Sequence, residues 1–197
     1  MKITPLGRNI PGIISNKALQ SLRLTKRDVL LDVGTGDGNK AIICARKCHL
    51  VIGIDINLKK LKLAKENARR KKIRNIIFVY GSFEKPCAKL DLSTYGITKI
   101  LALYSLHHLQ DELKWKSLKG LVRLLHKPGR MVIGDIIFFD EPQKYQKEFD
   151  KVHYDGGITD FPSSSNFLID CLKRLNGKVN VVQVHPLAGL VIADFLR

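Results

Sequence analysis

Short apolar runs alternate along the chain with longer segments whose apolar residues recur at helical spacing. The runs predict strands near residues 29–33, 50–54, 75–79, 98–104 and 130–137, and the spacing predicts helices near 38–48, 57–71, 110–125 and 164–175. Two further apolar runs, 178–184 and 190–196, flank a short connection and predict an antiparallel hairpin. Such alternation is typical of an α/β fold with helices on both faces of the sheet. We therefore predict a doubly wound, mostly parallel seven-stranded sheet with an antiparallel C-terminal strand.

Two segments fall outside this alternation. Residues 1–14 contain two prolines and two glycines, and we expect them to form an N-terminal arm. Residues 138–163 follow the fifth predicted strand and are rich in aromatic residues and glycine, so we expect a lid over the substrate. A length of 197 residues suits one α/β domain spanning residues 1–197.

A glycine-rich turn, Asp32-Val33-Gly34-Thr35-Gly36-Asp37-Gly38, joins the first predicted strand to the first predicted helix. Glycines at such a turn adopt positive φ and let the backbone approach a ligand, while the helix N-terminus offers free N–H groups. The third glycine comes one residue earlier than in the dinucleotide fingerprint G-x-G-x-x-G. The turn therefore predicts a nucleotide-type ligand other than a dinucleotide.

Two carboxylates narrow the ligand further. Asp32 precedes the first glycine by two positions, where it repels a pyrophosphate and attracts an ammonium group. Asp55 ends the second predicted strand, where it is placed to accept hydrogen bonds from ribose hydroxyls. An adenosine joined to a cationic amino acid satisfies both carboxylates.

With these features the chain resembles the class I S-adenosylmethionine-dependent methyltransferases, in particular the ubiquinone-biosynthesis-like and precorrin-type small-molecule branches. The resemblance continues through Leu103-Tyr104-Ser105-Leu106-His107-His108-Leu109 and through Lys127-Pro128-Gly129-Arg130. It implies S-adenosylmethionine as cofactor, with Asp32 on the ammonium, Asp55 on the ribose and Ile56 against the adenine. The cofactor-binding residues that it implies are Asp32, Gly34, Thr35, Gly36, Gly38, Asp55, Ile56, Ser82, Phe83 and Tyr104.

The sequence departs from the family pattern at two of these places. Gly81-Ser82-Phe83 stands where the family often has an acidic residue that reads the adenine edge, although Ser82 still offers a hydroxyl. The segment at Tyr104 lacks the Asn/Asp-Pro-Pro-aromatic motif of the base-modifying amine methyltransferases. His107 and His108 follow and are the candidate catalytic bases, because imidazole titrates near neutral pH. Their alternative role is to pack and cap the strand-to-helix junction.

The net charge of +16, from 34 Lys and Arg against 18 Asp and Glu, is the unusual bulk property. It introduces RNA as an alternative acceptor, since phosphate backbones bind basic surfaces. The basic run between Lys59 and Arg74 instead lies on a helix that leads away from the predicted ligand edge, where a solvated face explains it equally. We therefore favour a small-molecule acceptor, with an RNA (tRNA or rRNA) or protein methyltransferase and a non-catalytic cofactor-binding module as alternatives.

The four cysteines, at positions 44, 48, 87 and 171, form no C-x-x-C pair and are interpreted as core thiols, so no metal site is predicted. No apolar run is long enough to span a bilayer, and the N-terminus lacks the apolar region of a signal peptide. We expect a cytoplasmic protein without a membrane partner. The sequence predicts no oligomeric state.

Overall fold

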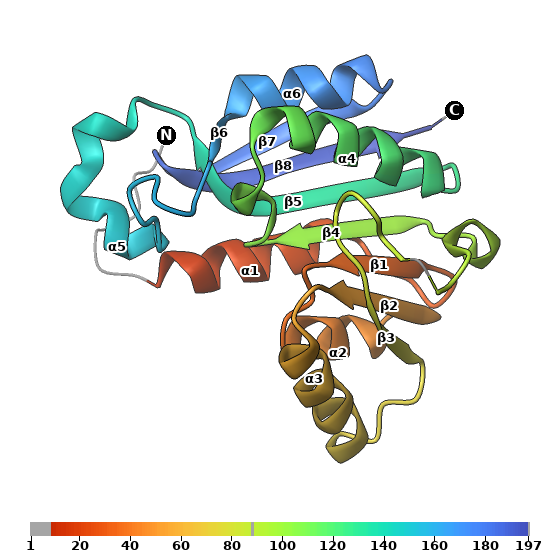
Figure 1. Ribbon diagram of the computed structural model, residues 1–197. Coiled ribbons are helices and arrows are strands. Elements are labelled where there is room, and N and C mark those ends of the chain that lie inside the picture. The colour runs from red at the N-terminus through yellow and green to blue at the C-terminus, as the bar shows by residue number, and fades with distance from the viewer. Residues whose placement is uncertain (1–8, 88, 197) are drawn as a thin grey trace.

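A computed structural model describes residues 9–87 and 89–196 and is organised around one mixed β-sheet (Figure 1). The strand order is β3-β2-β1-β4-β5-β8-β7, and the short strand β6 pairs with β5 beside this path. The first five strands run parallel, whereas β8 is antiparallel to both β5 and β7. The predicted α/β fold is therefore confirmed. The strands are β1 (Val29–Val33), β2 (Leu50–Asp55), β3 (Ile76–Tyr80), β4 (Lys99–Leu103), β5 (Gly129–Phe138), β6 (Ser163–Ser164), β7 (Lys178–His185) and β8 (Ala188–Phe195).

Helices cover both faces of this sheet and create two hydrophobic cores. Alternate residues of β1 divide between them, because successive side chains of a strand point to opposite faces: Leu31 joins one core and Leu30 the other. Helices α4 and α6 pack on the first face, and α1, α2 and α3 pack on the second (Figure 1). The helices are α1 (Ile10–Ser21), α2 (Asn39–Ala45), α3 (Leu58–Arg70), α4 (Asp111–Leu124), α5 (Phe149–Val152) and α6 (Ser165–Arg174), with 3-10 turns η1 (Leu92–Tyr95), η2 (Leu106–His108) and η3 (Pro142–Glu148).

Helix α1 was not expected from the sequence, which indicated an arm over residues 1–14. Residues 1–8 lie outside the described part of the chain, but residues 10–14 form the start of this helix. The proline that suggested an arm lies in its first turn, where no intrahelical N–H partner is required. Ile14, Ala18 and Leu22 are fully buried at a spacing of four residues, so burial of this stripe holds the helix on the sheet.

The segment 138–163 leaves the sheet at the end of β5 and returns to the same place. It contains η3 and α5, and β6 then pairs Ser163 with Ile137 and Ser164 with Phe138. Both ends of the segment are therefore fixed at the carboxyl edge of the parallel strands, where ligands of open α/β sheets bind. Within the described residues, no helix combines the length and the hydropathy that crossing a membrane requires.

Candidate functional site

The three loop glycines all have positive φ, but they differ in what surrounds them. Their φ values are +78° at Gly34, +58° at Gly36 and +76° at Gly38. A Cβ atom at Gly34 would lie 2.4 Å from Cβ of Ser105, and one at Gly38 would lie 2.7 Å from Cζ of Phe78. A Cβ atom at Gly36 would meet no atom within 4 Å. Packing therefore requires glycine at two of the positions, while the third faces open space that a ligand can approach.

These differences predict different stabilities for two alanine variants. Gly38→Ala combines the cost of a left-handed backbone with overpacking against Phe78 and Ala64, so we expect it to lower the free energy of unfolding by about 2–4 kcal/mol. Gly36→Ala adds only the backbone cost, about 1–2 kcal/mol. Urea unfolding of both variants measures the difference. Equal losses would contradict the packing role of Gly38.

Asp32 is a buried carboxylate at the end of β1. It is 3% exposed, and the hydroxyl of Thr35 donates a hydrogen bond of 2.7 Å to its Oδ2 atom. Burial raises the pKa of Asp32 to about 6, and the neighbouring Asp55 adds to this. Among the described residues, no Lys, Arg or His side chain forms an ion pair with it. A buried carboxylate without a cationic partner, beside open space at Gly36, fits an ammonium group of a ligand.

Asp55 connects the end of β2 to the glycine loop. Its Oδ2 atom accepts a hydrogen bond of 2.8 Å from the backbone N–H of Gly36, and its Oδ1 atom accepts one of 2.8 Å from Asn57. Each carboxylate oxygen can accept more than one hydrogen bond, so the group can also receive ribose hydroxyls. The next side chain, Ile56, is 63% exposed and offers an apolar surface beside this carboxylate.

The other predicted cofactor residues differ in accessibility. Ser82 is half-buried, and its Oγ atom accepts a hydrogen bond of 3.1 Å from the N–H of Lys85. Phe83 is 8% exposed and belongs to the core beneath α4. Tyr104 has φ of +49°, and its buried hydroxyl has no hydrogen-bond partner in the described residues. Ser82 follows Gly81, whose backbone N–H donates a 3.2 Å hydrogen bond to the carbonyl of Asp55. The Phe83 side chain points into the protein interior.

His107 and Asp135 form a buried pair at the carboxyl ends of β4 and β5. The Nδ1 atom of His107 is hydrogen-bonded to Oδ1 of Asp135. Asp135 also accepts backbone N–H groups from Ser105, Leu106, His107 and Ile136. Burial lowers the pKa of His107, but the carboxylates of Asp135 and Asp160 outweigh it, and the net pKa is raised. His107 therefore carries a proton on Nδ1 and is held in one orientation.

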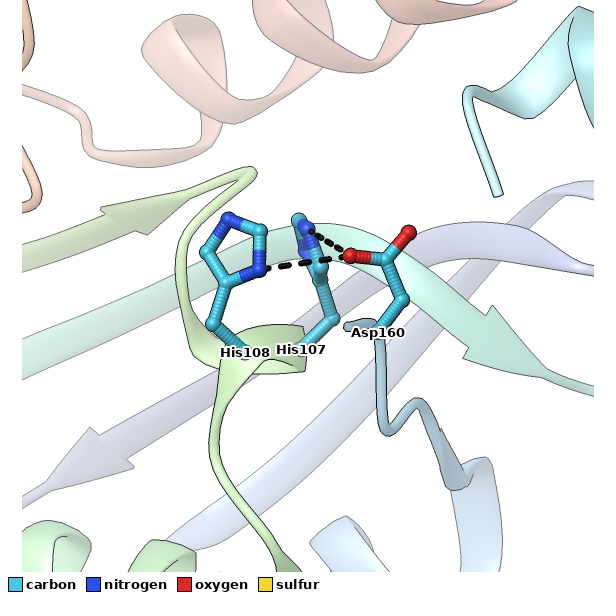
Figure 2. Close-up of side chains that lie close together, drawn as sticks. All are labelled: His107, His108 and Asp160. Carbon is cyan, nitrogen blue, oxygen red and sulfur yellow. Dashed lines mark ion pairs between the residues drawn. The ribbon is translucent and has the colours of Figure 1, made fainter. Parts of the chain in front are cut away.

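The segment 138–163 contributes Asp160 to the same place. Its Oδ1 atom lies 3.4 Å from Nε2 of His107 and 3.2 Å from Nδ1 of His108 (Figure 2). His107 is 7% exposed, whereas the side chain of His108 is 58% exposed. Two adjacent imidazoles and a carboxylate therefore converge at the edge of the sheet, with one imidazole open to solvent.

This segment is also anchored to α4 by a buried lysine. Lys114 is 1% exposed, and its ammonium donates hydrogen bonds to the carbonyl of Phe161, to Oγ of Ser163 at 2.6 Å and to Oδ1 of Asp111 at 3.1 Å. The backbone N–H of Phe161 donates a 2.7 Å hydrogen bond to the carbonyl of His107. The segment 138–163 is thus tied to α4 and to the histidine pair by side chains and backbone.

Residues 24–157 match the methyltransferase domain family. The chain belongs to this family, whose cofactor is S-adenosylmethionine. It is 27% identical over 141 residues to 27-O-demethylrifamycin SV methyltransferase of Amycolatopsis mediterranei, covering 71% of this chain and 50% of that protein. An uncharacterized RNA methyltransferase of Caldanaerobacter subterraneus is 32% identical over 78 residues, which cover 40% of this chain and 17% of that protein. The chain therefore spans half or less of these two relatives.

A solved structure supports the same fold for this methyltransferase domain. The YcgJ protein of Bacillus subtilis superimposes with a TM-score of 0.71 at 19% identity, covering 87% of this chain and 71% of that protein. At this identity the likeness shows the fold alone. The predicted class of cofactor is confirmed by the family, and its arrangement around individual residues stays a prediction.

The sequence identified part of this methyltransferase site and missed part of it. The structure brings together Asp32, the glycine loop and Asp55, as predicted. It adds Asp160 and Lys114, which lie 53 and 7 residues from His107 along the chain, and it pairs His107 with Asp135, 28 residues away. Asp135 had an indirect signal, since it lies in a strand at the ligand edge. For Asp160 and Lys114 the sequence carried no signal, because their contacts depend on how the segment 138–163 returns to the sheet.

Proposed function

We propose that this protein transfers the methyl group of S-adenosylmethionine to a hydroxyl group of a small organic molecule. The cofactor half of the proposal is carried by the buried carboxylate of Asp32, which pairs with no cation of the described residues, beside the open space at Gly36 and next to Asp55. The hydroxyl acceptor follows the O-methyl position that the name of the rifamycin relative gives. A cationic amino-acid group joined to a ribose matches these carboxylates. A pyrophosphate at the same place would be repelled by both.

Calorimetric titration with S-adenosylhomocysteine and, separately, with NAD tests the cofactor. We expect S-adenosylhomocysteine to bind and NAD not to bind. Asp55→Ala removes the acceptor of the ribose hydroxyls and the hydrogen bond that holds the backbone N–H of Gly36. We therefore expect the affinity for S-adenosylhomocysteine to be 10- to 100-fold weaker. Asp170→Ala, an exposed carboxylate on α6, is the control and should bind as the wild type does. Binding of NAD in place of S-adenosylhomocysteine would refute the proposal.

The bound cofactor supplies a methyl group on a positively charged sulfur, and the protein must align an acceptor with it. Asp32 and the glycine loop hold the cofactor from the β1 and β2 side. The cluster of His107, His108 and Asp160 lies on the β4 and β5 side, with Ser105 of the same turn in contact with Gly34. Fixing two reactants in this way supplies up to about 7–11 kcal/mol of the barrier reduction. The hydroxyl of the acceptor faces this histidine cluster.

A small acceptor is favoured over RNA by the position of the basic residues. The basic face comprises nine exposed cations on α3 and the turn before β3, at the β3 edge of the sheet, whereas the histidine cluster lies at the ends of β4 and β5, on the other side of β1. The rifamycin relative also matches more of this chain than the RNA relative does, 71% against 40%. The basic face consists of Lys59, Lys60, Lys62, Lys65, Arg69, Arg70, Lys71, Lys72 and Arg74.

RNA is the second candidate acceptor because the basic face is hollowed. A groove of about 570 Å³ between α3 and β3 is lined by Lys65, Arg69, Lys72 and Arg74. Phosphate binding there would weaken steeply with salt. We expect methyl transfer from radiolabelled cofactor to a panel of hydroxylated small molecules and none to bulk transfer RNA. Methylation of the RNA, lost in a Lys65→Glu, Arg69→Glu variant, would favour the RNA alternative.

A further inference from the structure

Three potential metal ligands from two distant segments meet at the histidine cluster. His107 and His108 come from η2, directly after β4, and Asp160 comes from the segment that precedes β6 (Figure 2). Their nearest nitrogen and oxygen atoms all lie within 4.8 Å of one another. Two imidazoles and one carboxylate form a ligand set that divalent transition metals commonly use.

The two distances from Asp160 to the imidazoles match those between ligands of one ion. A tetrahedral ion with bonds of about 2.0–2.1 Å holds its ligand atoms about 3.3–3.4 Å apart. The Oδ1 atom of Asp160 lies 3.4 Å from Nε2 of His107 and 3.2 Å from Nδ1 of His108. Both contacts are ion pairs, and all three atoms lie within 4.8 Å of one another, close enough to coordinate a single ion.

The surroundings of His107 and Asp160 orient these atoms for coordination. With Nδ1 of His107 hydrogen-bonded to Asp135, Nε2 is the ring nitrogen left to coordinate an ion, and ion binding displaces the proton that it carries. Carboxylates behind metal-binding histidines fix the imidazole in this way. The second oxygen of Asp160 accepts a 3.1 Å hydrogen bond from the backbone N–H of Asp155, which leaves Oδ1 facing the imidazoles.

We propose that His107, His108 and Asp160 bind one divalent ion of the zinc class and leave its fourth position open. The exposure of His108 gives the ion access to solvent and to an acceptor. Ser105 donates a 2.9 Å hydrogen bond to the carbonyl of Val33, so the turn that carries the ligands is fixed against the glycine loop. The ion therefore lies on the acceptor side of the cofactor site.

The role of this ion rests on the proposed function. A hydroxyl oxygen bound at the open position loses its proton to water at a lower pH, as metal-bound water does. The oxygen then forms a bond to the methyl carbon while the carbon–sulfur bond breaks, and its electron pair stays on sulfur. The ion thus binds the acceptor and stabilises the negative charge on the acceptor oxygen.

Metal binding is tested without any acceptor. The protein is stripped with a chelator and dialysed, and titrated with Zn²⁺ by calorimetry and with Co²⁺ by visible absorption. We expect one ion per chain. His108→Ala should weaken metal binding at least 10-fold, and it should keep the fold because His108 is exposed. Asp160→Asn should also weaken metal binding at least 10-fold. His49→Ala, an exposed imidazole beside the Cys48 thiol, is the matched control and should bind as the wild type does.

The outcomes separate this inference from the proposed function. Failure to bind an ion, or equal binding by wild type, His108→Ala and Asp160→Asn, overturns the metal site. Loss of binding in His49→Ala instead would place the ion at the thiols of Cys44 and Cys48 and overturn it as well. Titration of the same stripped protein with S-adenosylhomocysteine reports on the cofactor alone. Cofactor binding without metal binding would leave the proposed function intact and remove the ion.

Discussion

Replacing Asp32 with Asn is expected to weaken the binding of S-adenosylhomocysteine about 100-fold or more while making the ligand-free protein more stable. The loss of affinity arises because the ammonium of the ligand would be buried without its carboxylate, a defect of about 3–5 kcal/mol. Asn keeps an oxygen that accepts the hydroxyl of Thr35, so the loop is expected to keep its conformation. Calorimetry and chemical denaturation of the same preparations measure both effects.

The gain in stability follows from the raised pKa of Asp32. The pKa of a free aspartate is 3.8 and burial raises that of Asp32 to about 6 in the folded protein, so folding disfavours the charged form. The cost is absent below pH 3.8, grows between pH 3.8 and 6, and is complete above pH 6, where it reaches at most about 3 kcal/mol. At pH 7 the Asn variant should therefore unfold at a higher denaturant concentration than the wild type, and at pH 4 the two should coincide.

The same carboxylate gives ligand binding a defined pH dependence. Only charged Asp32 attracts the ammonium, so wild-type affinity should fall as the pH drops below about 6 and be constant above it. The Asn variant should lack this step. Asp37→Asn is the matched control, because Asp37 lies in the same loop and its carboxylate accepts a 3.1 Å hydrogen bond from the N–H of Asn39 instead of lying beside Asp55. An unchanged affinity in Asp32→Asn would remove the central argument for the cofactor site.

Replacing Lys114 with Met is expected to lower the free energy of unfolding by about 3–5 kcal/mol. The ammonium joins three groups from two segments, and its removal leaves the partly buried carbonyl of Phe161 without its partner. The side chains of Asp111 and Ser163 remain hydrogen-bonded to each other. Detachment of residues 155–163 should follow, with faster amide hydrogen exchange there than in the sheet.

Lys116→Met on the same helix is the control for Lys114, because Lys116 is exposed. Its free energy of unfolding should lie within about 0.5 kcal/mol of the wild type. S-adenosylhomocysteine should bind Lys114→Met nearly as it binds the wild type, because β1 and β2 hold the cofactor residues. Similar stabilities for the two lysine variants would show that Lys114 does not anchor the segment 138–163.

The cofactor side of the site was predictable from the sequence because its signals are local. Asp32 and the three glycines lie within seven residues of a strand-to-helix turn, and Asp55 ends the next apolar run. Short-range backbone preferences fix the turn, and hydrophobic periodicity places both strand ends at one edge. Helix α1 was missed for a local reason as well, since Pro11 and Gly12 resemble breakers but lie in a first turn, where they are tolerated.

The acceptor side depends on contacts that no local pattern encodes. His107 and Asp135 meet because β4 and β5 are neighbours in the sheet, although 28 residues separate them. Asp160 reaches them because β6 returns the segment 138–163 to β5. The sequence by itself determined the alternation of elements, the glycine loop and the class of ligand, since each is specified within a few residues. The tertiary structure alone decided that two imidazoles and a distant carboxylate lie together. The order of the strands and the pairing of β6 with β5 set which side chains meet.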